Sequence, residues 1–209
     1  MDLAHPIRAL VPSLEGPVLT VLAGLTNAVS GREVARLAGT ASPAGVQRVL
    51  SRLVTEGVVR AERRSHAVLY SANRDHLAWP AVEVLTGLRR ELLQRITDAV
   101  RAWPHAPRTA AVFGSLARGE GGVDSDVDLL LVHEDDLSSA ESRAWEAQVD
   151  ALVSAIEAWT GNAAQPYVVS IAQFQAHVEA SEAIVGSWRR EAITLVGSDV
   201  SALVRSVTR

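Results

Sequence analysis

The amino-acid sequence predicts an α+β protein of two domains. The first observation is the distribution of charge: residues 1–80 carry nine arginines against six acidic residues, whereas residues 81–209 carry eleven arginines against eighteen acidic residues. The second is a change of pattern, from helix signals followed by a hairpin to strands that alternate with helices. We therefore expect one domain at 1–80, a linker or dimerisation helix at 81–104, and a second domain at 105–209.

The composition limits the classes of protein to which the chain can belong. Of the 209 residues, 48% are hydrophobic, which is enough for a substantial core. There is no apolar run long enough to span a bilayer and no basic-then-apolar signal sequence. Cysteine is absent, which excludes disulfides and thiolate metal sites. We expect a soluble, cytoplasmic protein with no membrane partner.

Three helix signals follow one another in the first domain. Apolar residues recur at helical spacing over 14–25. Ser30 and Glu33 have the spacing of a capping box, which predicts a short second helix. Ser42 followed by Pro43 predicts the start of a third helix, with serine as the cap and proline at the first helical position.

A β-hairpin signal follows the third helix. Residues 58–72 contain two β-branched stretches around a polar tip at 62–66, where His66 is interpreted as a surface residue. The order of helix, short helix, turn, helix and hairpin over 14–75 resembles the winged helix-turn-helix of the arsenical-resistance and multiple-antibiotic-resistance regulators. The resemblance implies a bacterial transcription regulator that binds double-stranded DNA.

The resemblance also indicates which residues would contact DNA. In a helix-turn-helix the recognition helix lies in the major groove, where arginine pairs with guanine and glutamine with adenine. Arginines at a wing tip enter the minor groove or contact phosphates. A single copy would bind weakly, so we expect a homodimer on a two-fold site. Two alternatives are an ordinary solvated surface and a protein-binding module. The candidate DNA-contacting residues are Ser42, Gln47, Arg48, Ser51, Arg52, Arg63 and Arg64.

A long apolar stripe connects the two halves of the chain. Its spacing predicts one continuous helix over 81–102 that ends before Pro104. Such a helix could join the two domains or form a dimer seam. The residues of the stripe are Leu85, Leu88, Leu92, Ile96 and Val100.

The second half of the chain alternates between strands and helices. A strand is expected at 109–113 and another at 127–132, followed by a helix at about 139–159. A third strand is expected at about 166–172, with helices from there to the end of the chain. This order predicts a small α/β domain.

The candidate metal-binding and phosphate-binding residues of the second half lie from the end of its first predicted strand to the start of its second. Asp126 and Asp128 share one face of a strand because successive side chains alternate, and paired carboxylates suit Mg²⁺. Gly114 lets the backbone approach a phosphate closely, and Ser115 supplies a hydroxyl donor. Arg118 is a bidentate phosphate partner. Together these residues predict a site for a metal-bound triphosphate.

This stretch resembles the signature of the polymerase-beta-like nucleotidyltransferases. Its local sequence is similar to that of their small bacterial branch, the minimal nucleotidyltransferases. The resemblance covers about 108–198. It implies a small mixed sheet backed by helices, a nucleoside triphosphate such as ATP bound through two Mg²⁺ ions, and nucleotidyl transfer to a hydroxyl. The predicted fold is thus a winged helix-turn-helix followed by a small mixed α/β nucleotidyltransferase-fold domain. The matching residues are Gly114, Ser115, Ala117, Arg118, Gly119, Ser125, Asp126 and Asp128.

One residue of the family pattern is missing. Active members of the superfamily carry a third carboxylate on a later strand, but residues 165–174 contain neither Asp nor Glu, and Glu157 and Glu179 are predicted on helices. Two-metal catalysis needs both ions to be held. Our hypothesis is a DNA-binding regulator whose second domain binds Mg-NTP, with Asp126 and Asp128 in the catalytic position but weak or silent catalysis. The alternative is an active enzyme that transfers a nucleoside monophosphate to a small-molecule or protein hydroxyl.

Overall fold

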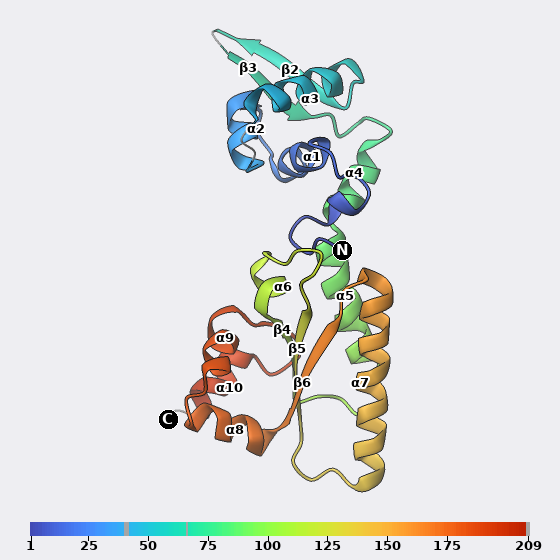
Figure 1. The fold of residues 1–209 in the computed structure, drawn as a ribbon, viewed down its shortest axis with the longest axis vertical. Coiled ribbons are helices and arrows are strands. Elements are labelled where there is room, and N and C mark those ends of the chain that lie inside the picture. The colour runs from blue at the N-terminus through green and yellow to red at the C-terminus, as the bar shows by residue number, and fades with distance from the viewer. Residues whose placement is uncertain (40–41, 66, 208–209) are drawn as a thin grey trace. The chain divides into compact units, whose positions relative to one another are not determined.

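The computed structural model describes residues 1–39, 42–65 and 67–207. The chain divides into two compact units (Figure 1). One unit is His5–Arg89, and the other combines Met1–Ala4 with Arg90–Arg209. His66 and residues 40–41 of the predicted turn lie outside the described residues.

The unit of His5–Arg89 contains the predicted order of helix, short helix, helix and hairpin, with an additional two-residue strand before the second helix. Its three strands form an antiparallel sheet in the order β1-β3-β2. The assignment of this unit to the winged helix-turn-helix class stays a prediction. Its elements are a 3-10 helix Pro6–Ala9, α1 Glu15–Gly24, β1 Val29–Ser30, α2 Gly31–Leu37, α3 Pro43–Thr55, β2 Val59–Arg64, β3 Ala67–Ala72 and α4 Trp79–Thr86.

The predicted helix caps are present, one of them only in part. The Ser30 hydroxyl accepts from the Glu33 amide at 3.2 Å, as expected. The Glu33 carboxylate, however, accepts from the Arg36 guanidinium at 2.6 and 2.9 Å and makes no described bond back to Ser30. The Ser42 hydroxyl accepts from the Gly45 amide at 3.2 Å at the start of α3. Local hydrogen bonds therefore set both helix starts.

The predicted continuous helix over 81–102 is wrong in one respect, because the structure contains two helices there. α4 ends at Thr86 and α5 runs from Leu88 to Arg101. The Thr86 hydroxyl donates to the Val82 carbonyl at 2.9 Å, and the Gly87 amide donates to the Glu83 carbonyl at 3.0 Å. Glycine favours a break because its backbone is the least restricted. The apolar spacing continues across the break, so periodicity alone did not reveal it.

The other unit has a four-stranded mixed sheet in the order β6-β5-β4-β7. β5 pairs with β6 in parallel and with β4 antiparallel, and β4 pairs antiparallel with β7. β7 was not predicted, since we expected only helices after the third strand, and that strand lies at 164–170 rather than 166–172. The elements after α5 are β4 Thr109–Phe113, α6 Gly114–Arg118, β5 Val127–His133, α7 Ser139–Thr160, β6 Ala164–Ser170, α8 Ile171–Glu179, α9 Ala183–Glu191, β7 Ile193–Gly197 and α10 Val200–Val207.

The two faces of this sheet have separate apolar cores. One face, with Leu129 of β5, packs against α5 and α7. The other face, with Leu130 of β5, packs against α8, α9 and α10, which lie on the opposite side of the sheet (Figure 1). Because side chains alternate along a strand, Asp128 belongs to the face that α8, α9 and α10 cover. None of the described helices is both long and apolar enough to cross a membrane.

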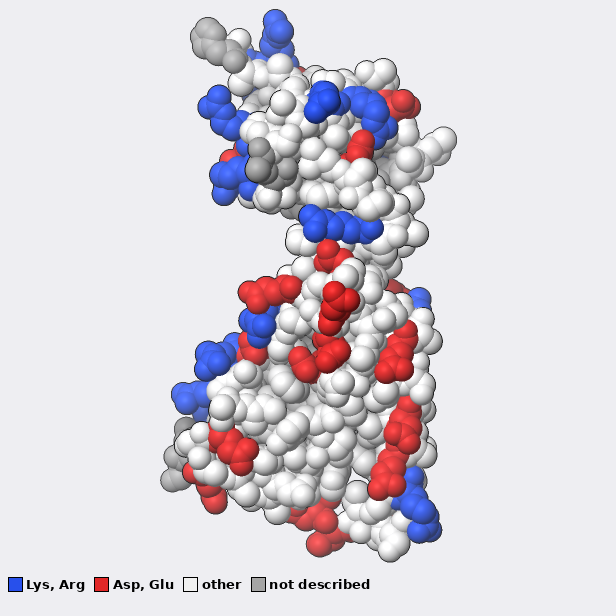
Figure 2. All heavy atoms as spheres, viewed as in Figure 1, with Lys and Arg blue, Asp and Glu red and all other residues white. Residues whose placement is uncertain are grey.

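Charge differs between the units. The unit of His5–Arg89 has ten arginines against six acidic residues, whereas the other unit has ten against eighteen. On the face drawn in Figure 2, blue arginines predominate over the first unit and red carboxylates over much of the second.

Candidate functional site

The structure brings the Gly-Ser turn and the Asp126–Asp128 pair together. Phe113, the last residue of β4, pairs with Asp128 across the antiparallel β4–β5 ladder. The turn that starts at Gly114 therefore lies beside Asp128. Gly114 has a φ of +67°, and a Cβ atom added to it would overlap the carboxylate oxygen Oδ2 of Asp128. Glycine is therefore required at this position by backbone conformation and by space.

The turn continues directly into the short helix α6. No side chain caps the start of α6, so its first amides are not used by a capping group. Ser115 is half-buried, and its carbonyl accepts from the Glu120 amide at 2.9 Å. Gly119 ends α6 with a left-handed φ of +73° and turns the chain into the loop that leads to Asp126. The start of α6 thus lies beside Asp128, and the loop that follows α6 leads back to Asp126.

The two aspartates differ in environment. Asp126 is exposed, whereas Asp128 is half-buried. Burial raises the pKa of Asp128, the negative charges of Asp126 and Glu191 add to this rise, and Arg118 opposes it. Two carboxylates that repel each other in a partly desolvated place have an electrostatic reason to bind a divalent cation.

Arg118 lies beside this pair but already has two carboxylate partners. Its Nε donates to Glu120 at 2.7 Å, and its Nη1 donates to Glu191 at 2.6 Å. These bonds raise the pKa of Arg118, and Arg118 lowers the pKa of Glu191. The guanidinium has five N–H groups, so three are left for a phosphate. Arg118 was predicted as a phosphate partner, and the structure adds two groups that orient it.

Glu191 is the acidic residue that sequence reasoning missed. It is the last residue of α9, and its side chain is only 12% exposed. We had considered Glu157 and Glu179 as the nearest acids, and both lie on helices as predicted. No sequence signal identified Glu191, because it is more than 60 residues from Asp128 and carries no motif. Only the packing of α9 against α6 and β4 brings it near.

The strand that could have carried a third carboxylate is β6. It runs parallel to β5, with Gln165 in register with Asp128. A residue with a neutral side chain therefore pairs with Asp128 on the strand where the family resemblance led us to expect a third carboxylate. Among the described residues there is no group of three or more His, Cys, Asp or Glu that could hold a metal ion. The donors that are present suit one Mg²⁺ whose remaining ligands are phosphate oxygens and water.

The predicted DNA-contacting residues are only partly available. On α3, the Gln47 amide donates to the Tyr70 hydroxyl at 2.8 Å, and the Ser42 hydroxyl caps the helix. Ser51 is exposed. On β2, Arg64 forms an ion pair with Glu62 at 2.8 Å, whereas the side chain of Arg63 has no partner among the described residues.

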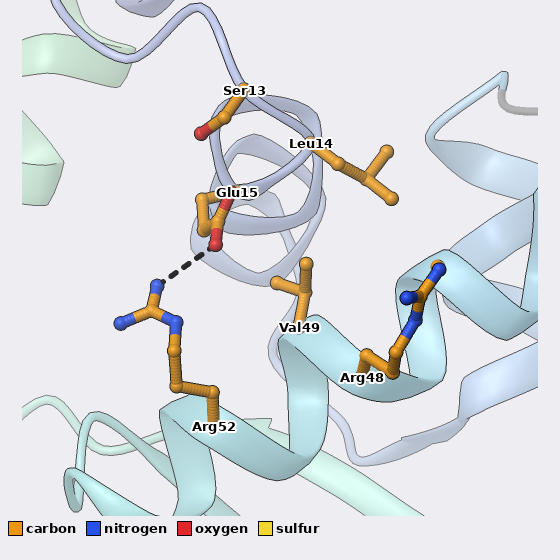
Figure 3. A pocket seen from close by; sticks show the side chains of 7 residues that line it. Ser13, Leu14, Glu15, Arg48, Val49 and Arg52 are labelled. Carbon is orange, nitrogen blue, oxygen red and sulfur yellow. Dashed lines mark hydrogen bonds and ion pairs between the residues drawn. The ribbon is translucent and has the colours of Figure 1, made fainter.

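A groove of about 400 Å³ separates the other two arginines of α3 (Figure 3). Arg52 points across the groove and forms an ion pair with Glu15 at the start of α1, at 3.1 Å. Val49 lies between Arg52 and Arg48, and Leu14 lines the groove from the side of α1 (Figure 3). Arg48 has no partner among the described residues. Arg48 and Arg63 are thus the predicted DNA-contacting arginines whose charges are not already paired.

Comparison with known proteins agrees with the geometry of the second unit. Residues 93–175 match the family described as nucleotidyltransferase domain, and this range includes Gly114, Asp126 and Asp128 but not Glu191. No curated protein matches the chain. Two solved structures resemble it, one titled as a toxin–antitoxin with AMP-PNP and one as a mutant of the toxin–antitoxin MntA-HpeT. Their identities are 17% and 16% and their TM-scores 0.37 and 0.36, and each alignment covers 56% of this chain and 83% of the other. Residues 93–175, which lie in the second unit, are therefore similar to the nucleotidyltransferase domain family.

Proposed function

We propose that the unit containing residues 90–209 binds a magnesium complex of a nucleoside triphosphate, ATP being the first to test. The observation that carries the proposal is the close approach of Gly114 to the carboxylate of Asp128. Asp126 and Asp128 would hold the metal, while the Gly114–Ser115 backbone, the Ser115 hydroxyl and Arg118 would donate to phosphate oxygens.

The same geometry supports weak or absent nucleotidyl transfer. A bound Mg²⁺ supplies charge stabilisation at the phosphoryl oxygens. Gln165 stands beside Asp128 on β6, so no described carboxylate there is available to hold a second ion or to accept the proton of an attacking hydroxyl. The intact aspartate pair and the family match favour the alternative, an active transferase with a small-molecule or protein hydroxyl as acceptor.

Calorimetry tests the proposed binding of Mg-ATP, and a transfer assay separately tests the proposed weakness or absence of nucleotidyl transfer. We expect Mg-ATP to bind the full chain. We expect D126N to weaken this binding at least about tenfold, because an interaction with one charged group contributes about 1.5–3 kcal/mol. D124N, which removes a charge from the exposed loop just before Asp126, is the matched control. Absence of binding to the unaltered chain would refute the site. Transfer of labelled nucleotide that depends on Asp126 would refute the proposal of weak or absent catalysis. It would establish that the protein is an active transferase.

A second function, DNA binding by the unit of His5–Arg89, is supported by two arginines that have no partner within 1–39, 42–65 and 67–207. Arg48 on α3 and Arg63 on β2 lie on the two elements that a winged helix-turn-helix uses against DNA, and this unit has a surplus of arginine. We propose that the unit is a winged helix that binds double-stranded DNA as a homodimer and serves transcription regulation. R48A should lower sequence preference and R63A should mainly reduce the salt dependence of binding.

The DNA proposal is tested by fluorescence anisotropy on a panel of labelled duplexes at several salt concentrations. R36A is a matched control, since Arg36 is an exposed arginine of the same unit already paired with Glu33. Loss of affinity in R48A and R63A but not in R36A supports the proposed surface. Equal behaviour of all three variants, or no binding by the unaltered chain, would refute it.

A further inference from the structure

The connection between α7 and β6 lies directly against the loop that precedes Asp126. Asn162 in this connection is only 3% exposed, which makes it one of few buried polar side chains among the described residues. Its Nδ2 donates to the carbonyls of Val123 at 3.0 Å and Ser125 at 2.9 Å, with a longer contact of 3.5 Å to the carbonyl of Gly122. One buried amide therefore contacts the carbonyls of three residues in the loop just before Asp126.

The residue that follows Asn162 holds the other side of Asp126. The Val127 amide donates to the Ala163 carbonyl at 2.8 Å. The peptide groups on both sides of Asp126 are thus bonded to consecutive residues, Asn162 and Ala163. Asp126 itself precedes Val127, the first residue of β5, and so has no place in the sheet ladder. Its position depends on these two anchors.

Asn162 is itself held in place by hydrogen bonds. Its backbone amide donates to the Thr160 hydroxyl at 3.0 Å, and that hydroxyl donates to the Ile156 carbonyl within α7 at 2.7 Å. Gly161 allows this turn because it takes a left-handed φ of +72°. The amide at position 162 is needed as a donor: an aliphatic or acidic side chain would leave the carbonyls of Val123 and Ser125 without a partner.

We propose that Asn162 is a positioning residue for the metal-nucleotide site, which it serves by fixing Asp126 relative to Asp128. The inference rests on the proposed Mg-ATP function of this site. A cation held by two carboxylates needs both at a defined separation, and Asp128 is already fixed by β5 and by Gly114. Asp126 has no such support of its own. Asn162 therefore acts through the loop and does not touch metal or nucleotide.

The test separates metal-dependent from metal-independent binding. In N162A we expect the affinity for Mg-ATP to fall about tenfold or more, while the affinity for ATP in EDTA changes less than about threefold. N162S, which keeps one donor and is less disruptive, should give an intermediate loss and serves if N162A does not fold. Direct titration with Mn²⁺, followed by electron paramagnetic resonance, should show the same order of variants without nucleotide.

Q148A is the matched control. Gln148 also uses its side-chain amide to hold a loop, donating to the His105 carbonyl at 3.2 Å and accepting from the His105 amide at 3.1 Å. That loop precedes Thr109, at the end of β4 opposite to Gly114. We expect Q148A to lower the melting temperature as N162A does but to leave Mg-ATP binding unchanged.

Each outcome bears on a different claim. If the unaltered chain does not bind Mg-ATP, the proposed function fails and the role of Asn162 fails with it. If the unaltered chain binds and N162A binds equally well, only the role of Asn162 is overturned. If Q148A loses as much metal-dependent affinity as N162A, the loss reflects general destabilisation and the positioning role is also overturned.

Discussion

Gly114 is the residue on which the candidate nucleotide site depends most directly. In G114A the new methyl group would overlap the carboxylate of Asp128, and the left-handed φ of +67° would be strained in addition. We expect a loss of about 1–2 kcal/mol from the backbone alone and no detectable binding of Mg-ATP. Thermal unfolding and calorimetry would measure the two effects.

G122A is the control for that experiment. Gly122 lies in the loop between Gly119 and Asp126, and a Cβ atom there would meet nothing within 4 Å. The stability of G122A and its affinity for Mg-ATP should both be close to those of the unaltered chain. Equal binding by G114A and G122A would mean that the approach of Gly114 to Asp128 has no bearing on nucleotide binding.

Asp128 is expected to make the protein less stable at neutral pH in the absence of a ligand. Its pKa is raised in the folded state by burial and by the charge of Asp126, so folding favours the protonated form. The resulting cost to stability is absent below the ordinary aspartate pKa, grows as pH rises through the folded pKa, and is complete at neutral pH. D128N should therefore melt higher at pH 7, by about 1–3 °C.

The pH dependence distinguishes this effect from a general change of charge. The gain in D128N should shrink towards zero as the pH is lowered to about 4, near the ordinary pKa of aspartate. D124N removes an equal charge from the exposed loop and should give no comparable gain. A D128N variant that melts lower than the unaltered chain at pH 7 would contradict the electrostatic argument.

At the scale of elements, local patterns predicted most helices and strands because their causes are local. The caps at Ser30 and Ser42 and the alternation of aliphatic residues in β5 depend on neighbours in sequence. β7 was missed because it is a five-residue edge strand of half-buried residues that follows α9 after a single residue. The break at Gly87 was missed because apolar periodicity continues through it.

The candidate site could be predicted only where the chain makes it from adjacent elements. Gly114 and Asp128 lie on either side of an antiparallel pair, so their convergence follows from the order of β4, α6 and β5. Glu191 and Asn162 reach the same region from α9 and from the α7–β6 connection. Such contacts depend on how helices pack against the sheet, which spacing in one sequence does not reveal.

The ion pair between α1 and α3 leads to a prediction at the scale of elements. Glu15 holds Arg52 at 3.1 Å across the groove, so this arginine is not available to DNA. E15Q should release it, strengthen DNA binding about threefold or more, and steepen the salt dependence by about 0.9 for one additional phosphate contact. The cost to stability should be small, since exposed ion pairs contribute about 0–1 kcal/mol.

E56Q is the matched control for E15Q, because Glu56 caps the other end of α3 and its loss changes the net charge equally. Anisotropy with the same labelled duplex would compare the variants. A gain in E15Q that exceeds that in E56Q indicates release of Arg52. Equal gains would indicate general electrostatics and would contradict the specific role of the ion pair.

At the scale of the whole molecule, the question is whether the two units act on each other. A basic unit with exposed arginines is joined in one chain to an acidic unit in which residues 93–175 match the nucleotidyltransferase domain family. The division falls within the first turn of α5. If nucleotide regulates DNA binding, the two equilibria must be linked, and linkage requires equal effects in both directions.

We therefore expect the affinity of the full chain for a labelled duplex to change at least about fivefold on addition of Mg-ATP, the lower end of typical coupling between two sites. The reciprocal measurement, Mg-ATP affinity with and without saturating duplex, must give the same factor. D126N should abolish the effect of nucleotide on DNA binding while leaving the DNA affinity without nucleotide unchanged. If Mg-ATP and duplex each bind but neither affects the other, the two units act independently, and a nucleotide-sensing regulator is ruled out in favour of two separate activities on one chain.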